Sequence, residues 1–350
     1  MKPIAVHFGA GALGRGLVVP LLIESGFDVI AIDSDEKLLA SIRERQGYDL
    51  LLTDTRETQH IHLRDILHPA DEKLTGWLQH ASVITTSVRK ENLHRIVKQL
   101  KNVPPKTLIC CENIEYSGRF FAELMQEGGV NPDGWRLPDC MVDRICSSCW
   151  PASTLIEAES WGTICIQKLE GATTVQQFEQ VENITLRFQE KRILVNTYAD
   201  GISFLGLAAG KQYLYQAAES EEIRLAMDNY MQLMKLYLCQ ECHLDANYLE
   251  KMAEKHRLRL CNPHIKRSLE SVARNFLQKI GPTERFIYPL TVLQQRGVDI
   301  QPAISFLNVL INGWANTQSE PQLARQQALA SLNVAEIVER LEQEEPAQIS

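Results

Sequence analysis

Near its start the chain reads Ile4-Ala-Val-His-Phe-Gly-Ala-Gly-Ala-Leu-Gly-Arg-Gly16, an apolar strand pattern that leads into a glycine-rich turn and then a helical pattern. The glycines follow the spacing Gly9-x-Gly11-x-x-Gly14. Gly9 allows the tight turn, Gly11 lets the backbone approach a pyrophosphate, and Gly14 lets the helix pack close to the strand. The positive end of that helix would face the phosphates. We therefore expect a dinucleotide site here. The alternative is a strand–turn–helix unit that holds no ligand.

A second apolar strand supports this interpretation. The segment Asp28–Asp33 ends in a carboxylate about 20 residues after the glycines, as the dinucleotide fingerprint requires. A carboxylate at Asp33 would accept hydrogen bonds from the adenosine ribose and repel a 2′-phosphate, so we expect NAD rather than NADP. Arg89 and Lys90 would favour NADP if their loop folded toward the adenosine. The expected cofactor-binding residues are Gly9, Ala10, Gly11, Ala12, Leu13, Gly14, Asp33, Thr86 and Glu112.

Length and composition set wider limits. The chain has 350 residues, of which 45% are hydrophobic, so it can form two domains with buried cores. A net charge of -8 argues against a nucleic-acid partner. No apolar run approaches the roughly 18 residues of a membrane span, and no signal-peptide pattern opens the chain. We expect a cytoplasmic protein with a small-molecule substrate, no membrane partner, and a monomeric state rather than a large oligomer.

The nine cysteines are an odd number, which favours reduced thiols over a disulfide framework. Two pairs, Cys146/Cys149 and Cys239/Cys242, have the spacing of redox or metal sites. The second pair lies in a long helical pattern that places its cysteines on neighbouring faces. We predict buried thiols and no metal site, with metal or redox chemistry as the alternative.

Strand and helix patterns alternate through the first part of the chain, which predicts a parallel, doubly wound sheet. In such sheets, ligands bind beyond the carboxyl ends of the strands. This rule places Thr85–Ser87 and Glu112–Asn113 near the cofactor. The expected strands after Asp33 are Tyr48–Thr53, His60–Asp65, Ala81–Val88 and Thr107–Cys111, and the expected helices are Glu36–Arg45, Lys90–Leu100 and one that follows Asn113 and runs to Gln126.

The pattern changes in the second half. Residues 151–195 look strand-like, notably at Trp161–Ile166 and Ile184–Phe188, so we expect the sheet to extend there. Beyond Thr197 the periodicity is helical, with expected helices at Glu221–Cys242, Tyr248–His256, Lys266–Leu277, Phe286–Arg296 and Ala303–Trp314. The fold class is α/β, a Rossmann-type doubly wound parallel sheet with a C-terminal all-helical domain. We expect a dinucleotide-binding domain at 1–190, a substrate domain at 191–350, and a reaction site in the cleft between them.

Lys191-Arg-Ile-Leu-Val-Asn196 stands at that boundary. Oxidation of an alcohol by NAD needs a base for the hydroxyl proton and donors for the developing oxyanion. A lysine whose pKa burial has lowered can be that base, and an asparagine five residues on could face the same oxygen. The alternative is an exposed lysine before a helix, with Asn196 as the N-cap.

Taken end to end, the chain resembles the polyol-specific long-chain dehydrogenases. Five stretches carry the resemblance: His7–Gly16 with Asp33, Cys111–Asn113, Val142–Ile145, Lys191–Asn196 with Phe204–Gly206, and, more loosely, Asn262–Arg285. The family implies a Rossmann domain, a helical substrate domain and no metal. By position, the resemblance makes Lys191 the general base, Asn113 and Asn196 the oxyanion donors, and Asp143 a supporting carboxylate.

The chain departs from the family at three places around the expected substrate. The family has a histidine three residues after the motif asparagine, where this chain has Ala199. Tyr198, Asp200 or His264 could take over its role. Arg89-Lys90 stands where the family usually has a glycine and a neutral residue, and Cys146–Cys149 replaces a proline-containing turn.

The resemblance implies an NAD-dependent oxidoreductase that interconverts a secondary alcohol and a ketone on a polyol or sugar phosphate, with mannitol 1-phosphate and fructose 6-phosphate as the default pair. Arg274, Lys279 and Arg285 are candidates to bind the phosphate, and their alternative role is as solvated helix charges. Two other functions remain open. One is a reductase of the same fold for a different polyhydroxy substrate, and the other is an NAD-binding protein with little catalysis.

Overall fold

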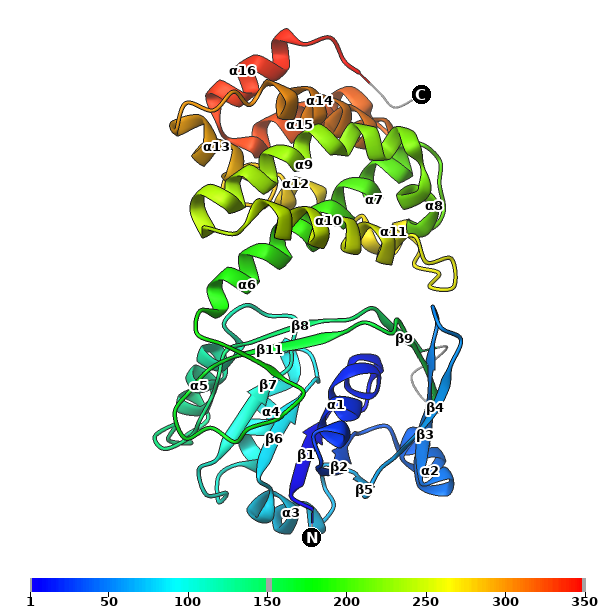
Figure 1. Ribbon diagram of the computed structural model, residues 1–350, viewed down its shortest axis with the longest axis vertical. Coiled ribbons are helices and arrows are strands. Elements are labelled where there is room, and N and C mark those ends of the chain that lie inside the picture. The colour runs from blue at the N-terminus through cyan, green and yellow to red at the C-terminus, as the bar shows by residue number, and fades with distance from the viewer. Residues whose placement is uncertain (1, 149–152, 348–350) are drawn as a thin grey trace. The chain divides into compact units, whose positions relative to one another are not determined.

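The computed structural model describes residues 2–148 and 153–347. The chain divides into two compact units, Met1–Phe188 and Gln189–Ser350, which are coloured blue to green and green to red in Figure 1. The first unit contains every described strand, and the elements described in the second unit are helices joined by loops.

A five-stranded parallel sheet forms the centre of the first unit. Its strand order is β5-β2-β1-β6-β7, and every neighbouring pair is parallel. The order therefore reverses at β1, and a crevice is expected beyond the carboxyl ends of strands at such a reversal. The strands are β1 (Ile4–Phe8), β2 (Asp28–Ile32), β5 (Asp65–Leu67), β6 (Val83–Thr86) and β7 (Thr107–Cys110).

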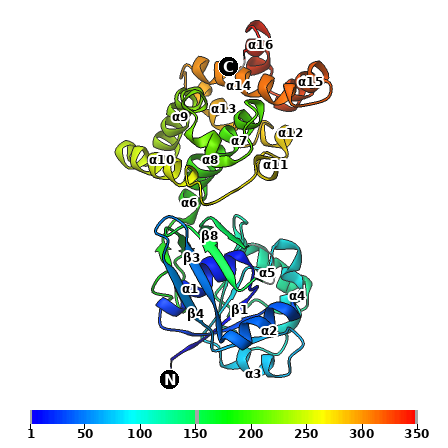
Figure 2. The same ribbon diagram turned by 90° about the vertical axis from the view of Figure 1, so that its right-hand side faces the viewer.

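Helices cover both faces of this sheet (Figure 2). Alternate residues of β2 enter different cores: Val29 joins the core under the first helices, and Ile30 joins the core on the opposite face. Burial on both faces explains why these strands read as nearly continuous apolar runs. On one face lie η1 (Gly14–Val18), α1 (Val19–Glu24) and α2 (Glu36–Arg45); on the other lie α3 (Lys73–His80), α4 (Leu93–Gln99) and α5 (Ser117–Glu127), with the short turn η2 (Lys90–Asn92) before α4.

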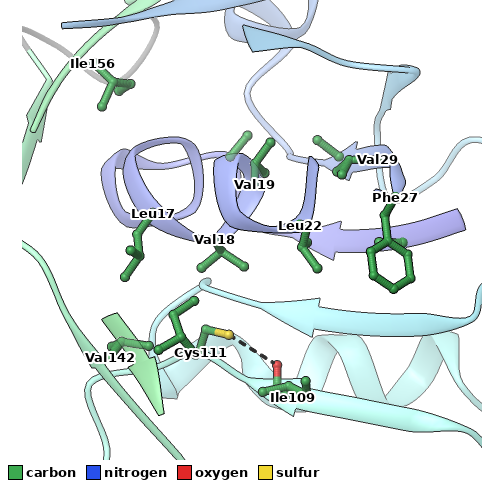
Figure 3. Close-up of a cluster of buried hydrophobic side chains, with 14 of the residues drawn as sticks. Leu17, Val18, Val19, Leu22, Phe27, Val29, Ile109, Cys111, Val142 and Ile156 are labelled. Carbon is green, nitrogen blue, oxygen red and sulfur yellow. Dashed lines mark hydrogen bonds between the residues drawn. The ribbon is translucent and has the colours of Figure 1, made fainter. Parts of the chain in front are cut away.

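The core beneath the glycine-rich turn ties the first helix to later parts of the chain. Figure 3 shows Leu17, Val18 and Leu22 on one side of this helix, pointing toward Cys111 and Val142. All five side chains are at most 4% exposed. The packing of this helix therefore holds the glycine-rich turn that precedes it in place against the parallel sheet.

The parallel sheet does not extend into residues 151–195. The strands there join two separate sheets, of order β4-β3-β10-β9 and β12-β11-β8. Their members are β3 (Gly47–Leu52), β4 (Thr58–His62), β8 (Cys140–Asp143), β9 (Cys146–Ser148), β10 (Leu155–Ala158), β11 (Thr163–Gln167) and β12 (Glu179–Val181).

The prediction of a strand at Ile184–Phe188 was wrong, because these residues lie in helix α6 (Ile184–Glu190). Ile184 and Phe188 are four residues apart, a spacing that fits one face of a helix as well as one face of a strand. Both are buried in one small core. The side-chain Oδ1 of Asn183 accepts a hydrogen bond from the backbone N–H of Thr185 at 3.1 Å, which supports a helix start at this point.

In the second unit, helix α14 (Gln301–Asn316) contacts four other helices, namely α7 (Tyr198–Ala208), α9 (Glu221–Cys242), α15 (Pro321–Leu332) and α16 (Ala335–Gln343). The helix predicted at Lys266–Leu277 is instead two short helices, α11 (Leu269–Val272) and α12 (Phe276–Lys279), because Asn275 adopts the left-handed conformation between them. No helix in the described ranges is both long and apolar enough to span a membrane. The remaining described helices of this unit are η3 (Lys191–Thr197), α8 (Leu214–Glu219), α10 (Ala246–Leu260) and α13 (Tyr288–Gln295).

Candidate functional site

A cavity of about 490 Å³ lies where the strand order reverses. Phe8 and Gly9 line it from the end of β1, Asp33 from the end of β2, and Val88 from the loop after β6. Gly11 of the glycine-rich turn also lines it. The cavity is thus built within the first unit, at the place where an open parallel sheet binds its ligand.

The three motif glycines have different structural reasons. Gly9 has φ +102°, and a Cβ there would lie 2.4 Å from the carbonyl oxygen of Ser87. A Cβ on Gly14 would lie 2.1 Å from the carbonyl oxygen of Gly9. A Cβ on Gly11 would meet no atom within 4 Å. Packing therefore requires Gly9 and Gly14, whereas the open side of Gly11 leaves room for a ligand next to the backbone.

His7 is completely buried and supports the turn from below. Its Nε2 lies 3.0 Å from the carbonyl oxygen of Gly9 and 3.0 Å from Ser87 Oγ, and its Nδ1 lies 2.8 Å from Thr85 Oγ1. A carbonyl can only accept, so Nε2 carries the proton and Nδ1 accepts from the threonine. Burial lowers the pKa of His7 to about 4, which keeps the ring neutral.

Asp33 links the second strand to the glycine-rich turn. Its Oδ2 accepts a hydrogen bond from the backbone N–H of Ala10 at 2.8 Å, and its Oδ1 accepts one from Asp35 at 3.0 Å. These contacts orient the carboxylate, which lines the cavity. Ala12 and Leu13, which follow Gly11, begin the helix, and both are partly buried.

Arg15 is a structural residue of the turn that the sequence reasoning missed. It is 1% exposed, its Nε donates to the carbonyl oxygen of Ala10 at 2.6 Å, and its Nη1 donates to that of Ser153. Its guanidinium lies 5.7 Å from the ring centroid of Tyr48. The signal was present in the sequence: an arginine within an otherwise apolar helix start must find partners if it is buried.

Thr86 and Glu112 meet beneath the loop that follows β6, and neither belongs to the cavity lining. Glu112 Oε1 accepts from Thr86 Oγ1 at 2.9 Å and from the backbone N–H of Val88 at 2.8 Å. Its Oε2 accepts from the backbone N–H of Arg89 at 3.0 Å. Burial raises the pKa of Glu112, while these hydrogen bonds oppose the shift. The two side chains therefore shape the cavity by fixing its loop.

The other candidates in the first unit are Asn113 and Asp143. Asn113 is exposed just after β7, and Asp143 ends β8 with 9% exposure.

Burial raises the pKa of the Cys146 thiol to about 12, so the thiolate is disfavoured. Its predicted partner Cys149 lies outside the described residues. Within residues 2–148 and 153–347, no group of three His, Cys, Asp or Glu side chains could hold a metal ion, and Cys239 and Cys242 are free thiols.

Lys191 and Asn196 belong to the second unit and lie in the π-helix η3. In a π-helix, the hydrogen bonds join residues i and i+5. Residues five apart are therefore neighbours across one turn, and both side chains are partly accessible. Ala199, at the position of the family histidine, follows one turn later in α7.

The three cations predicted to bind phosphate separate into two environments. Lys279 Nζ lies 2.7 Å from Asp200 Oδ1, and Arg285 Nη1 lies 3.0 Å from Asp200 Oδ2. Arg274 is exposed. Asp200 is 6% exposed, and burial raises the pKa of its carboxyl while the two cations oppose that shift. Because two cations share one carboxylate, Lys279, Arg285 and Asp200 together carry one net positive charge.

Comparisons with solved structures identify the fold. A substrate-free D-sorbitol dehydrogenase aligns with a TM-score of 0.74 at 15% identity, covering 97% of this chain and 92% of that one. The Pseudomonas fluorescens mannitol 2-dehydrogenase, solved in ternary complex with NAD and D-mannitol, aligns with a TM-score of 0.65 at 15% identity, covering 98% and 87%. Both are similar in fold.

Sequence comparisons identify the family. The mannitol-1-phosphate 5-dehydrogenase of Shouchella clausii (strain KSM-K16) is 27% identical over 314 residues, covering 84% of each chain. That of Enterococcus faecalis (strain ATCC 700802 / V583) is 25% identical over 334 residues, covering 88% of this chain and 86% of its own. The family model described as the mannitol dehydrogenase Rossmann domain matches residues 3–183, more than half of the 350 residues. The chain therefore belongs to the mannitol dehydrogenase family of oxidoreductases.

Proposed function

We propose that this chain is an NAD-dependent dehydrogenase that interconverts a secondary alcohol and a ketone on a sugar phosphate, with mannitol 1-phosphate and fructose 6-phosphate as the pair. The observation that carries the proposal is that one cavity is lined by both Gly11, whose side is open, and Asp33. Family membership and the names of the similar curated enzymes support the reaction class. We assign residues 1–190 to cofactor binding and 191–350 to substrate binding.

The residues of the cavity fit NAD. The backbone at Gly11 has open space for a diphosphate, and the oriented carboxylate of Asp33 can accept hydrogen bonds from the ribose hydroxyls. The same negative charge disfavours a 2′-phosphate. When bound, NAD accepts or returns the hydride.

The second unit supplies the proton chemistry in this proposal. Lys191 takes the proton from the substrate hydroxyl, and the side-chain amide of Asn196 donates a hydrogen bond to the same oxygen. The π-helical register supports this pairing, because it makes the two residues neighbours across one turn. Asn113 is the second oxyanion donor and Asp143 the supporting carboxylate.

A phosphorylated substrate suits the charge of the second unit. Lys279 and Arg285 together outweigh the single charge of Asp200, and Arg274 is accessible to solvent. Such cations bind phosphate well. Ala199 favours a second candidate, a different polyhydroxy substrate, because the methyl group occupies less space than the family histidine.

The test is the oxidation of NADH by the purified chain with fructose 6-phosphate, beside unphosphorylated fructose, and the reverse reaction with mannitol 1-phosphate and NAD. We expect turnover that requires the phosphate. Lys191→Ala should lower kcat by about 10² to 10⁴-fold while the affinity for NADH persists. Lys211→Ala, at an exposed lysine of the same unit, is the matched control and should retain the wild-type rate.

The possible outcomes separate the candidates. Turnover of another polyol or sugar with these substrates inactive would favour the second candidate, and an Ala199→His variant would then gain activity toward fructose 6-phosphate. NADH binding without turnover of any polyol would indicate a cofactor-binding protein with little catalysis. A chain that does not bind NADH would refute the proposal.

A further inference from the structure

Arg89 adopts a backbone conformation that is almost confined to glycine. Its φ is 71° and its ψ is 150°. This combination of φ and ψ is essentially forbidden to residues with a Cβ, and such a residue keeps it only where the surrounding structure enforces it. Most other non-glycine residues with positive φ, such as Gln46 and Tyr116, lie in the left-handed helical region, which side chains occasionally adopt.

Contacts on both sides of the peptide enforce this conformation. Glu112 accepts the backbone N–H of Arg89 at 3.0 Å and that of Val88 at 2.8 Å. Asn92 donates its backbone N–H to the carbonyl oxygen of Arg89 at 3.0 Å and its side-chain amide to that of Val88 at 2.8 Å. Two neighbouring segments thus hold an arginine where glycine would be free of strain. Strain that is maintained in this way is typical of functional positions.

Arg89 lines the same cavity as Gly9, Gly11 and Asp33. Its loop abuts the glycine-rich turn, because Ser87 leaves no room for a Cβ on Gly9. The neighbouring Lys90 has its Nζ 4.7 Å from the ring centroid of Phe120, which does not belong to the cavity lining. Of these two adjacent cations, Arg89 is therefore the one that the cavity receives.

Within the described part of the chain, the guanidinium of Arg89 has no hydrogen-bond or ion-pair partner. The carboxylate of Asp33 is in the same cavity, but it accepts its hydrogen bonds from the backbone N–H groups of Ala10 and Asp35. The cavity therefore offers a positive charge that is available to a ligand, beside a turn whose open backbone suits a diphosphate.

We propose that Arg89 binds the diphosphate of the dinucleotide and holds it against the Gly11 turn. This inference rests on the proposed function, and adds a side-chain contact to the backbone contacts that the glycine motif provides. A guanidinium suits this role because it offers paired donors to phosphate oxygens. The diphosphate is favoured over a 2′-phosphate because Asp33 would repel a phosphate on the ribose.

The test compares Arg89→Gly, Arg89→Gln and Arg89→Lys with the wild-type chain in titrations with NADH, ADP-ribose and NADPH, followed by calorimetry. We expect the glycine and glutamine variants to bind NADH and ADP-ribose about 10- to 100-fold more weakly, since a hydrogen-bonded charge is lost. The lysine variant should retain part of the affinity. High salt should reduce the difference between wild type and the glycine variant.

A second readout separates the charge from the backbone. Glycine removes the strain, so Arg89→Gly should raise the thermal midpoint of the cofactor-free chain by a few degrees although it weakens cofactor binding. Glutamine keeps the strain and removes only the charge. If the glutamine variant loses affinity as the glycine variant does, the guanidinium and not the backbone carries the contact.

Unchanged NADH affinity in Arg89→Gly, beside a wild-type chain that binds NADH, would overturn this inference and leave the proposed function standing. Weakened NADPH binding with intact NADH binding would also overturn it, because the contact would then be with a 2′-phosphate. A wild-type chain that does not bind NADH would overturn the proposed function itself, and this inference with it.

Discussion

Replacing His7 with glutamine should remove a pH dependence of folding stability that the buried ring creates. Burial lowers the pKa of His7 from 6.5 to about 4. Between these values the unfolded chain binds a proton that the folded chain does not, so stability is fully present above pH 6.5 and is lost as the pH falls toward 4. The groups that contact the ring are Thr85, Gly9 and Ser87, none of which titrates in this range.

The magnitude follows from the interval between the two pKa values. It corresponds to about 3 kcal/mol of unfolding free energy, of which about 2 kcal/mol is lost between pH 7 and pH 5. Glutamine can still donate to the carbonyl oxygen of Gly9 but cannot titrate. His7→Gln should therefore be less stable than wild type at pH 7, by about 1–2 kcal/mol for the disturbed hydrogen bonds. At pH 5 this difference in the free energy of unfolding should disappear, or the variant should be the more stable of the two.

Urea denaturation at pH 7 and at pH 5 measures both free energies, with the wild-type chain, His7→Gln and a surface control. His94→Gln is the matched control, because His94 is exposed on helix α4. We expect the control to lose as much stability as wild type between the two pH values and His7→Gln to lose about 2 kcal/mol less. Equal losses in all three chains would refute the assignment of a neutral, buried imidazole.

Three further substitutions test other contacts. Gly14→Ala places a Cβ 2.1 Å from a backbone carbonyl oxygen and should lower the free energy of unfolding in urea by about 1–3 kcal/mol. Gly11→Ala, whose Cβ meets no atom within 4 Å, should retain the wild-type stability and weaken NADH binding in a fluorescence titration. Equal stability of the two variants would contradict this prediction. Glu112→Gln leaves one backbone N–H of the loop facing an amide donor, so it should lower the free energy of unfolding by about 1–3 kcal/mol and weaken NADH binding. An unchanged affinity for NADH would show that the loop does not need this carboxylate. Asp200→Asn leaves two half-buried cations without a counter-charge and should lower stability at pH 7 by about 1–3 kcal/mol; an unchanged urea midpoint would contradict it.

Elements whose apolar periodicity has only one interpretation were predicted correctly from the sequence. Helix α2 occupies the predicted range Glu36–Arg45, and α9 occupies Glu221–Cys242. The error at Ile184–Phe188 arose where one pattern fits both a strand and a helix, and only the packing of α6 decides between them. The split of Lys266–Leu277 depends on the backbone of Asn275, a single residue that periodicity does not report.

The glycine turn and its acidic residue could be found from sequence because their spacing is local. The contacts that shape the cavity could not. Glu112 meets the N–H of Arg89 across 23 residues, and Asp200 meets Lys279 across 79. A local pattern contains no information about such pairs, since the fold brings them together. The positive φ of Arg89 likewise depends on this long-range contact as well as on the local hydrogen bonds from Asn92.

The spacing of Lys191 and Asn196 gains its meaning from the π-helix in which both lie. In an α-helix, each residue advances by about 100°, so residues five apart point about 140° away from one another. A lysine and an asparagine placed in this way could not both reach one substrate oxygen from the same helix. The i to i+5 hydrogen bonds of η3 make them neighbours across one turn instead. A π segment is rare and is frequently found at functional sites. Its occurrence over the Lys191–Asn196 motif is therefore what makes a proposed base and a proposed oxyanion donor compatible with a spacing of five.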